Sequence, residues 1–423
     1  MTEPAITHGA NVLDIDPWSI PLERIDVSNP DLFLHDAWRP YFKRLRAEAP
    51  VHYCTQSLFG PYWSVTRFKD IQHVDTNHQI FSSQPTIVLG DAPEDFLLNP
   101  GFIAMDPPGH DEQRQTVQSV VAPANLMRLE PLIRERVSAI LDQLPLGEEF
   151  DWVDRVSIEL TTQMLATLFD FPWEDRRKLT CWSDMATAGP RQSGAGNISE
   201  EQWRSTMMEC LDYFTVLWNE RVNKVPGERL DLITMLAHGE ATRNMTPLEY
   251  LGNLILLIVG GNDTTRNSIS GGVLALNENP AQYAKLRADP ALIPNMVSEI
   301  IRWQTPLAYM RRTANCDTGL GGQRIRKGDK VVMWYVSGNR DEEVIEHADE
   351  FIIDRARARH HISFGFGIHR CMGNRLAEMQ LRIVWEEILA RFHTVEVSGA
   401  PQRVRSSFVR GYERLPVRLH ARK

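Results

Sequence analysis

The middle of the chain carries a helical pattern of hydrophobic positions. From about residue 109 to about residue 305, apolar residues recur every three or four positions, which is typical of helices with one face towards a core. The clearest start is Thr246-Pro-Leu-Glu249, because Thr246 can cap a helix, proline suits its first turn and Glu249 can complete a capping box. The pattern continues to about Leu276 and is apolar on nearly all sides at Leu254–Val259, so it predicts a long, buried central helix.

The N-terminal region shows a different pattern. Residues 1–30 are polar with Pro, Gly and Asn, and they predict a loosely ordered arm. Residues 37–49 predict a helix, and Val51–Tyr53 with Tyr62–Val65 predict a hairpin. A Pro- and Gly-rich loop then extends from about residue 84 to residue 109.

Strand character returns near the C-terminus. Residues 320–336 predict strands around the turn at Arg326–Asp329, with Val331–Val336 as the second strand. A glycine-dense loop at Phe364–Gly373 follows, and a last helix is expected to run from near Cys371 to about Phe392. Because the sequence shows no repeat or obvious linker, residues 31–423 are expected to form one large unit, mainly α with small β-sheets.

Composition narrows the class of protein. The 423 residues are 43% hydrophobic and 24% charged, which suits a globular chain with a large core, and the net charge of −9 argues against general nucleic-acid binding. The most apolar stretch, Leu251–Gly261, is shorter than the about 20 residues that a membrane span needs. Without a signal-peptide pattern, a soluble cytoplasmic protein is expected. Five cysteines without a C-x-x-C pair indicate neither disulfides nor a zinc ribbon.

The central helix contains an unusual polar segment, Gly260-Gly-Asn-Asp-Thr-Thr265. Each glycine costs about 1 kcal/mol relative to alanine in a helix, and buried polar groups need partners. One interpretation is a kink that accommodates packing. The other is a helix that lets a flat group approach Gly260, with Asp263 and Thr264 serving proton chemistry.

The loop Phe364-Gly-Phe-Gly-Ile-His-Arg-Cys-Met-Gly373 carries the strongest chemical signal. Its glycines allow tight turns and close backbone approach. His369, Arg370 and the start of the following helix place donors and positive charge beside Cys371, which favours a thiolate. Such a thiolate is either a nucleophile or a soft metal ligand.

This loop resembles the haem-thiolate signature of cytochromes P450, F-G-x-G-x-H-x-C-x-G, and the match consists of Phe364, Gly365, Gly367, His369, Cys371 and Gly373. Other segments resemble the family in the same order along the chain. Gly260–Thr265 is similar to the A/G-G-x-D/E-T-T/S segment of its oxygen-binding helix, and Glu299-x-x-Arg302 with Arg355 is similar to its structural charge network.

The resemblance implies a P450 fold, a triangular prism with haem between the central helix and the cysteine-loop helix. It implies haem b, with Cys371 as the axial ligand of the iron and with Phe364, Gly373 and Gly260 near the cofactor. Asp106-Pro-Pro-Gly-His110-x-x-x-Arg114 and the Arg312-Thr-Ala segment resemble the family's propionate ligands. His369 is a further candidate, and the preceding Arg311 leaves the assignment to Arg312 open by one position.

By resemblance, the protein is a monooxygenase that inserts one atom of O2 into an unactivated C–H bond. Thr264 would hold oxygen and water, and Asp263 would relay protons. Electrons would come from NAD(P)H through a ferredoxin reductase and a 2Fe-2S ferredoxin, and the protein would be a monomer. Basic residues near the thiolate would form a docking patch, although ordinary solvated charges fit equally well: Arg359, His360, Arg370 and Arg375.

Details around the motifs resemble the bacterial branch that hydroxylates terminal carbons of alkanes and fatty acids, although Glu378 stands where arginine is common in the family. Candidate pocket residues are aliphatic or aromatic positions near these motifs: Ile87, Val88, Leu89, Leu256, Val259, Gly260, Leu307, Ala308, Met310, Phe408 and Val409. Alternatives are a P450 acting on steroids, terpenoids or other bulky rings, a haem-thiolate sensor without turnover, and a thiol hydrolase using Cys371 and His369.

Overall fold

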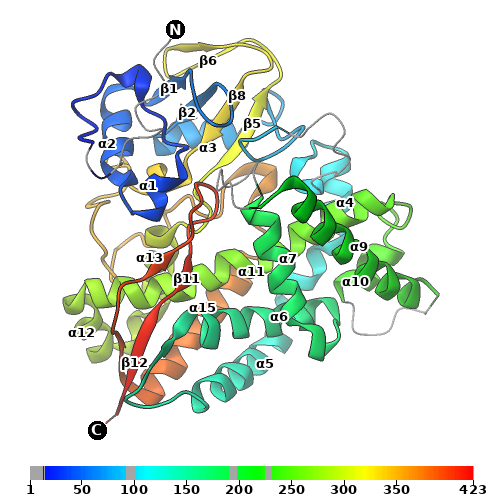
Figure 1. Cartoon of the computed structure of the whole chain (residues 1–423), viewed down its shortest axis with the longest axis vertical. Coiled ribbons are helices and arrows are strands. Elements are labelled where there is room, and N and C mark those ends of the chain that lie inside the picture. Colours follow the sequence, from blue (N-terminus) through cyan, green and yellow to red (C-terminus); the bar gives the residue numbers. More distant parts are fainter. Residues whose placement is uncertain (1–12, 14, 92–100, 190–197, 224–230, 423) are drawn as a thin grey trace.

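The computed structural model describes residues 13, 15–91, 101–189, 198–223 and 231–422. Its centre is helix α11 (Pro247–Glu278), which crosses the middle of the molecule (Figure 1). The predicted capping box is present: Thr246 Oγ1 accepts from the Glu249 N–H, and the Glu249 carboxylate accepts from the Thr246 N–H. The helix continues without a break through Gly260–Thr265, so the polar segment does not interrupt it.

Most of the remaining chain is helical and surrounds α11. Six helices contact α11 directly: α6 (Glu159–Phe169), α7 (Arg177–Ala188), α9 (Glu200–Val222), α12 (Pro280–Ala288), α13 (Ile293–Gln304) and α15 (Asn374–Arg391). The other α-helices within the described residues are α1 (Pro30–Leu34), α2 (Trp38–Glu48), α3 (Phe68–Thr76), α4 (Gly109–Gln118), α5 (Pro123–Asp142), α10 (Leu232–His238) and α14 (Tyr335–Gly338).

The largest sheet has five strands in the order β1-β2-β8-β5-β3 and lies near the N-terminal end of the molecule (Figure 1). Its strands are β1 (Val51–Cys54), β2 (Tyr62–Val65), β8 (Lys330–Met333), β5 (Met310–Ala314) and β3 (Phe81–Ser82). The predicted hairpin is β1–β2, paired antiparallel from Val51↔Val65 to Cys54↔Tyr62. Strand β5 pairs antiparallel with both β8 and β3, so it links the hairpin region to the loop after β3.

The described residues form three smaller sheets as well. The three-stranded sheet has the order β4-β12-β9, with β4 (Glu149–Asp151), β12 (Pro416–Ala421) and β9 (Phe392–Val397). Two hairpins are β6 (Thr318–Leu320) with β7 (Gln323–Ile325), and β10 (Gln402–Arg403) with β11 (Tyr412–Arg414). The prediction of a mainly α fold with small sheets is confirmed.

Two expectations about element boundaries are wrong. Strand β8 ends at Met333, and α14 begins at Tyr335, because the Trp334 carbonyl accepts from the Ser337 and Gly338 N–H groups. All of Val331–Val336 is buried, so an unbroken apolar run did not reveal where the strand stops. Of the loose arm predicted over residues 1–30, residues 15–30 pack on the protein instead, since Ile20, Ile25 and Val27 are buried in one hydrophobic cluster with α2. Residues 1–12 and 14 of that arm lie outside the described part of the chain.

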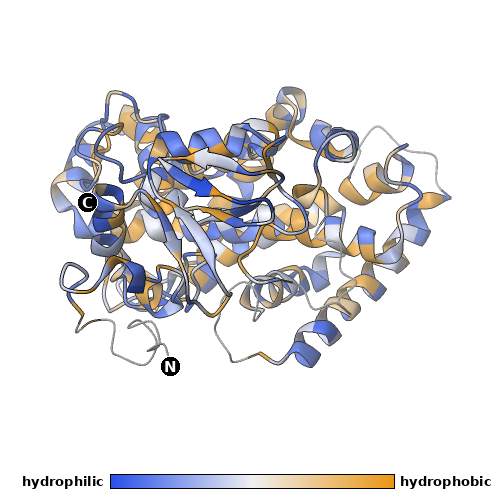
Figure 2. Cartoon of the chain, turned by 90° about the horizontal axis from the view of Figure 1, so that it is seen from above, coloured by the Kyte–Doolittle hydropathy of each residue, from blue (hydrophilic) through white to orange (hydrophobic). Residues whose placement is uncertain are grey.

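The buried hydrophobic residues form four clusters. Two lie among the helices, one around α5, α13 and α15 and the other around α6, α7 and α9, and α11 contributes to both. The other two lie on opposite faces of the five-stranded sheet, since Val332 belongs to one and its neighbours Val331 and Met333 belong to the other. Figure 2 shows hydrophobic and hydrophilic residues alternating along many helices, as expected for helices with one buried face.

Candidate functional site

The cysteine loop is held by a close backbone approach to the end of α3. Gly365 and Gly367 have φ values of +64° and +65°. A Cβ at Gly367 would lie 2.4 Å from the Asp75 carbonyl oxygen, and one at Gly365 would lie 3.0 Å from an Asp75 carboxylate oxygen. Both positions therefore require glycine, as the sequence pattern predicts. The Phe366 N–H donates to the Asp75 carboxylate at 2.7 Å, which fixes the loop further.

Cys371 lies at the end of this loop, just before α15. Its N–H donates to the Phe364 carbonyl at 2.9 Å, and backbone N–H groups of Gly373 and Asn374 favour the thiolate form. The residue keeps accessible surface, but its thiol lies deep among protein atoms. This burial raises the pKa of the thiol and outweighs the two N–H groups and the charges of Arg114 and Arg370, which act to lower it. The expectation of a lowered pKa is thus wrong for the protein alone. Metal coordination deprotonates such a thiol outright.

A cluster of basic side chains lies beside the cysteine loop. His110 and Arg114 come from α4, Arg312 from β5, and His369 from the loop itself. The rings of His110 and His369 are 4.3 Å apart between centroids. Burial, with the charges of Arg312, His110 and Arg114, lowers the pKa of His369 to about 2. His369 is therefore neutral beside Arg312 and Arg114, and burial also lowers the pKa of His110.

This cluster fits an anionic partner. His110 Nε2 and His369 Nδ1 are buried without a hydrogen-bond partner, and like charges converge around them. Buried polar atoms normally have partners, and two carboxylates would satisfy these donors and reduce the repulsion. The residues therefore fit the two propionates of a haem. His369 Nε2 lies 2.7 Å from Ser83 Oγ, so the Cys371–His369 hydrolase alternative lacks its hydrogen-bonded pair.

The structure separates the two adjacent arginines of β5. Arg312 pairs with Asp75 at 2.8 Å and is among the charges that act on His369. Arg311 extends to the other side of the strand, where it pairs with Asp91 at 2.6 Å. Alternating strand directions explain the separation. Arg312, not Arg311, therefore lies with the basic cluster.

The two glycines of α11 have different surroundings. A Cβ at Gly260 would meet no atom within 4 Å, whereas one at Gly261 would lie 2.7 Å from Leu165 Cδ2 of α6. Gly261 thus serves helix packing, and Gly260 faces open space. Thr264, one turn later, is part-exposed, and its hydroxyl donates to the Gly260 carbonyl at 3.1 Å. Gly261 therefore accommodates packing without a break in the helix, and the functional interpretation of Gly260, Asp263 and Thr264 stays a prediction.

Asp263 is fully buried and points towards α7. Ser183 Oγ donates to it at 2.9 Å, and Arg266, one turn along α11, pairs with it at 2.6 Å and also with the half-exposed Asp184. Burial raises the pKa of Asp263 to about 6, although the positive charge of Arg266 acts to lower it. The sequence pattern alone did not reveal Ser183 or Arg266 as partners. The i,i+3 spacing to Arg266 was a usable signal, but nothing in the sequence marked Ser183.

The predicted charge network is present near the C-terminal end of α13. Glu299 and Arg302 are both fully buried, and the two side chains form hydrogen bonds of 2.7 and 2.8 Å. Arg355 donates to the same carboxylate at 3.1 Å, and the Ile352 N–H donates at 2.8 Å. Although burial acts to raise it, these donors hold the pKa of Glu299 below its ordinary value.

The candidate pocket residues fall into three groups. Leu256 and Val259 of α11 are part-exposed and pack against the same helical cluster as Met372, the neighbour of Cys371. Met310 packs against the sheet face that includes Phe81 and Met333. The third group packs on the opposite sheet face: Ile87, Val88, Leu89, Leu307, Ala308, Phe408 and Val409.

Long-range backbone contacts assemble this third group. Leu307 and Val409 form an isolated antiparallel bridge, and the Ala308 N–H donates to the Phe408 carbonyl at 2.8 Å. Within the group, Ile87 and Leu307 retain exposed surface, whereas Leu89 and Ala308 have none. Leu89 and Ala308 are therefore too deeply packed to contact a ligand directly in this structure.

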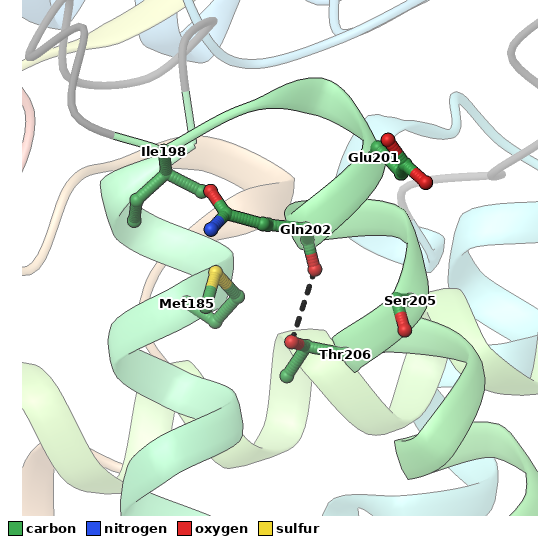
Figure 3. A pocket seen from close by; sticks show the side chains of 6 residues that line it. All are labelled: Met185, Ile198, Glu201, Gln202, Ser205 and Thr206. Atoms are coloured by element: carbon green, nitrogen blue, oxygen red, sulfur yellow. Dashed lines mark hydrogen bonds between the residues drawn. The ribbon is translucent and has the colours of Figure 1, made fainter.

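A separate hollow of about 540 Å³ lies between α7 and the start of α9 (Figure 3). Its lining consists of Met185, Ile198, Glu201, Gln202, Ser205 and Thr206. None of the predicted site residues belongs to it. Within the described parts of the chain, no helix is long and apolar enough to cross a bilayer, and no group of three or more His, Cys, Asp or Glu side chains is arranged to hold a metal.

A cysteine before a helix, a neighbouring basic cluster for two carboxylates and a central helix with an open glycine define a haem-thiolate site. The family model described as Cytochrome P450 matches residues 200–411. The chain is 38% identical over 410 residues to linalool 8-monooxygenase of Pseudomonas putida, covering 94% of this chain and 99% of that protein. It is 32% identical over 418 residues to methyl-branched lipid omega-hydroxylase of Mycobacterium tuberculosis, covering 95% and 96%.

Among solved structures, CYP153D17 from Sphingomonas sp. PAMC 26605 has a TM-score of 0.88 at 50% identity, covering 94% of this chain and 100% of that chain. This chain belongs to the cytochrome P450 family. It is a monooxygenase with the P450 fold, and its cofactor is haem with a cysteine thiolate as axial ligand. The sensor and hydrolase alternatives are therefore set aside.

Proposed function

We propose that this P450 hydroxylates the terminal carbon of medium-chain alkanes or fatty acids. The observation that carries the proposal is the apolar group in which part-exposed Ile87 and Leu307 meet Phe408 and Val409. The terminal C–H bond of a flexible chain reaches the iron only when apolar walls hold the chain and keep its inner carbons away from the iron. The relative named as an omega-hydroxylase supports the same position of attack.

The residues take the following roles in this proposal. Cys371 is the axial ligand, and the propionate ligands are His110, Arg114, Arg312 and His369, while Phe364 and Gly373 shape the loop around the cofactor. When bound, haem supplies oxygen activation, for which thiolate ligation favours O–O cleavage.

The proton chemistry is assigned to the polar segment of α11. Gly260 would leave room for oxygen beside the bound cofactor, since a Cβ at this position would meet no atom within 4 Å. Thr264 presents a part-exposed hydroxyl at this place. Asp263, whose pKa is raised to about 6, holds a proton on its carboxyl below that pH and passes it towards Thr264 after turning from Ser183 and Arg266.

We further propose that a 2Fe-2S ferredoxin, reduced by its NAD(P)H-dependent reductase, delivers electrons at the side of Cys371. Arg370 and Arg375 are exposed beside the thiolate, and Arg359 is exposed although it pairs with Glu378 at 3.2 Å. An acidic partner would be steered by these charges, so reduction by ferredoxin should slow as salt increases.

A second candidate is oxidation of terpenoids, which the relationship to linalool 8-monooxygenase favours. Titrations of the holoenzyme with dodecane, dodecanoate, linalool and a polycyclic steroid separate the two. Displacement of the iron-bound water changes the spin state and reports binding without turnover. Larger shifts for the linear chains support terminal hydroxylation, and larger shifts for linalool or the steroid support the second candidate.

The decisive variant is Leu307→Phe, because Leu307 is part-exposed in the apolar group while its backbone is fixed by the bridge to Val409. The larger ring is expected to narrow the pocket and shift or abolish terminal oxidation while the haem spectrum is retained. Ala308→Gly is a matched control, because Ala308 is fully buried at the next position. Unaltered products in Leu307→Phe would remove Leu307 from the pocket.

A further inference from the structure

Arg311 has no role in the site described above, although it lies next to Arg312. Its side chain is 4% exposed, and it extends to the sheet face that carries the apolar pocket group. Its Nη1 donates to Asp91 at 2.6 Å and to the Leu89 carbonyl at 3.2 Å. Its Nε is buried without a hydrogen-bond partner. This N–H is therefore a donor that remains available to an acceptor.

Lys330 of β8 supplies a second cation to the same place. Its Nζ pairs with the other oxygen of Asp91 at 2.6 Å and donates to the Phe59 carbonyl at 2.7 Å. Burial lowers the pKa of Lys330, and the charge of Arg311 lowers it further. A buried cation, Arg311, and a part-buried one, Lys330, thus share the carboxylate of Asp91, which is 58% exposed. The cluster has an excess positive charge that an additional anion would balance.

The position of this cluster relates it to the substrate pocket. Arg311 binds the carbonyls of Val88 and Leu89, and its own N–H donates to the Ile87 carbonyl at 2.8 Å. The side chains of these loop residues pack in the same group as Leu307 and Phe408. A cationic site therefore adjoins an apolar wall, which is the chemistry that receives a carboxylate with a hydrocarbon chain.

We propose that Arg311 and Lys330 form a binding site for the carboxylate of a fatty-acid substrate, whose chain lies along the apolar group. The inference rests on the proposed function and extends it, because it selects fatty acids over alkanes of the same length. The carboxylate accepts from Arg311 Nε and shares the positive charge with Asp91. Asp91 is then a competitor that weakens acid binding.

The test compares dodecanoate with methyl dodecanoate, its uncharged ester, by spin-state titration of the holoenzyme. Lys330→Gln is expected to raise the dissociation constant for dodecanoate about tenfold relative to the ester, since a charge-assisted contact is lost. Asp91→Asn is expected to lower the dissociation constant for dodecanoate about threefold relative to the ester, because a repelling charge is removed. Lys327→Gln, at an exposed position on the preceding turn, is the matched control and leaves the acid-to-ester ratio unchanged.

The inference would be overturned if Lys330→Gln changed the dissociation constants for acid and ester equally, or left that for the acid unchanged. It would also be overturned if the wild-type enzyme bound the ester but not the acid. The ratio is measured without turnover, so it is independent of product analysis. Terminal oxidation of dodecane with an unchanged acid-to-ester ratio would refute only the carboxylate site. Absence of terminal oxidation for both dodecane and dodecanoate would refute the proposed function itself.

Discussion

The cysteine side and the substrate side of the site are built in different ways. On the cysteine side, two buried carboxylates are closely paired: Glu299 with two arginines, and Asp75 with Arg312 and the loop N–H of Phe366. On the proposed substrate side, Gly260 faces open space, and Thr264, Ile87 and Leu307 remain part-exposed. The first region is tied together by buried hydrogen bonds, and the second leaves accessible surface. Substitutions should therefore damage stability on one side and selectivity on the other.

The largest effect is expected for Cys371→Ala. Removing the sulfur removes the axial ligand, so the reduced-plus-carbon-monoxide band typical of haem-thiolate should disappear and oxygenation should stop. Cys316→Ala is the control, because Cys316 is also exposed but lies far along the chain at the start of the β6–β7 hairpin. A Cys371→Ala protein with the wild-type band and activity would refute the haem-thiolate assignment to this residue.

A large loss of stability is expected for Glu299→Gln. It leaves the buried Arg302 without a counter-charge, and breaking a buried pair of this kind costs about 3–5 kcal/mol. Denaturant unfolding of the holoenzyme measures the loss. Glu346→Gln is the control, because the Glu346 side chain is 90% exposed. A loss below about 1 kcal/mol, the scale of a surface pair, would show that the network contributes little.

The pH dependence sharpens this test. Because the folded protein lowers the pKa of Glu299 below its ordinary value of 4.5, the stabilisation is fully present above pH 4.5. It is lost as the pH falls through the folded-state pKa. The stability difference between wild type and Glu299→Gln should therefore shrink in acid, and a difference that is constant with pH would contradict the charge explanation.

These two regions also differ in how far sequence predicted them. The capping box of α11 and the glycines of the cysteine loop were predicted correctly because each depends on residues a few positions apart. The direction of the Cys371 pKa shift was predicted wrongly, because burial by distant elements outweighs the neighbours that the sequence shows. The separation of Arg311 from Arg312 depends on strand alternation and on Asp91, which lies 220 positions away in the sequence.

An intermediate effect is expected for Asp263→Asn. General acid catalysis contributes about 10²–10⁴ in rate, so product formation should fall by at least about 10²-fold while haem stays bound. Because the folded protein raises the pKa of Asp263 to about 6, its acid form is depleted as the pH rises through 6. Wild-type product per NAD(P)H should show an inflection there that Asp263→Asn lacks.

Asp212→Asn is the control for this prediction, because Asp212 is exposed on α9. The same inflection in Asp263→Asn would assign it to another group. A variant with wild-type product formation would remove Asp263 from the proton path and leave its pairing with Arg266 and Ser183 as a structural contact.

The smallest effects, and the sharpest comparison, come from two neighbouring substitutions in α11. Gly261→Ala places a methyl group 2.7 Å from Leu165 Cδ2 in a buried contact. Overpacking costs about 1–3 kcal/mol, and the helix preference of alanine offsets about 1 kcal/mol of this.

Gly260→Ala meets no atom within 4 Å, so only the helix preference acts and the protein should become slightly more stable. Its methyl group, however, occupies the space over the proposed haem position. Gly261→Ala should therefore lower the denaturation midpoint with little change in substrate titrations, and Gly260→Ala should weaken the substrate-induced spin change without loss of stability. If Gly260→Ala left substrate binding unchanged, the open face of this helix would be a packing feature rather than part of the site.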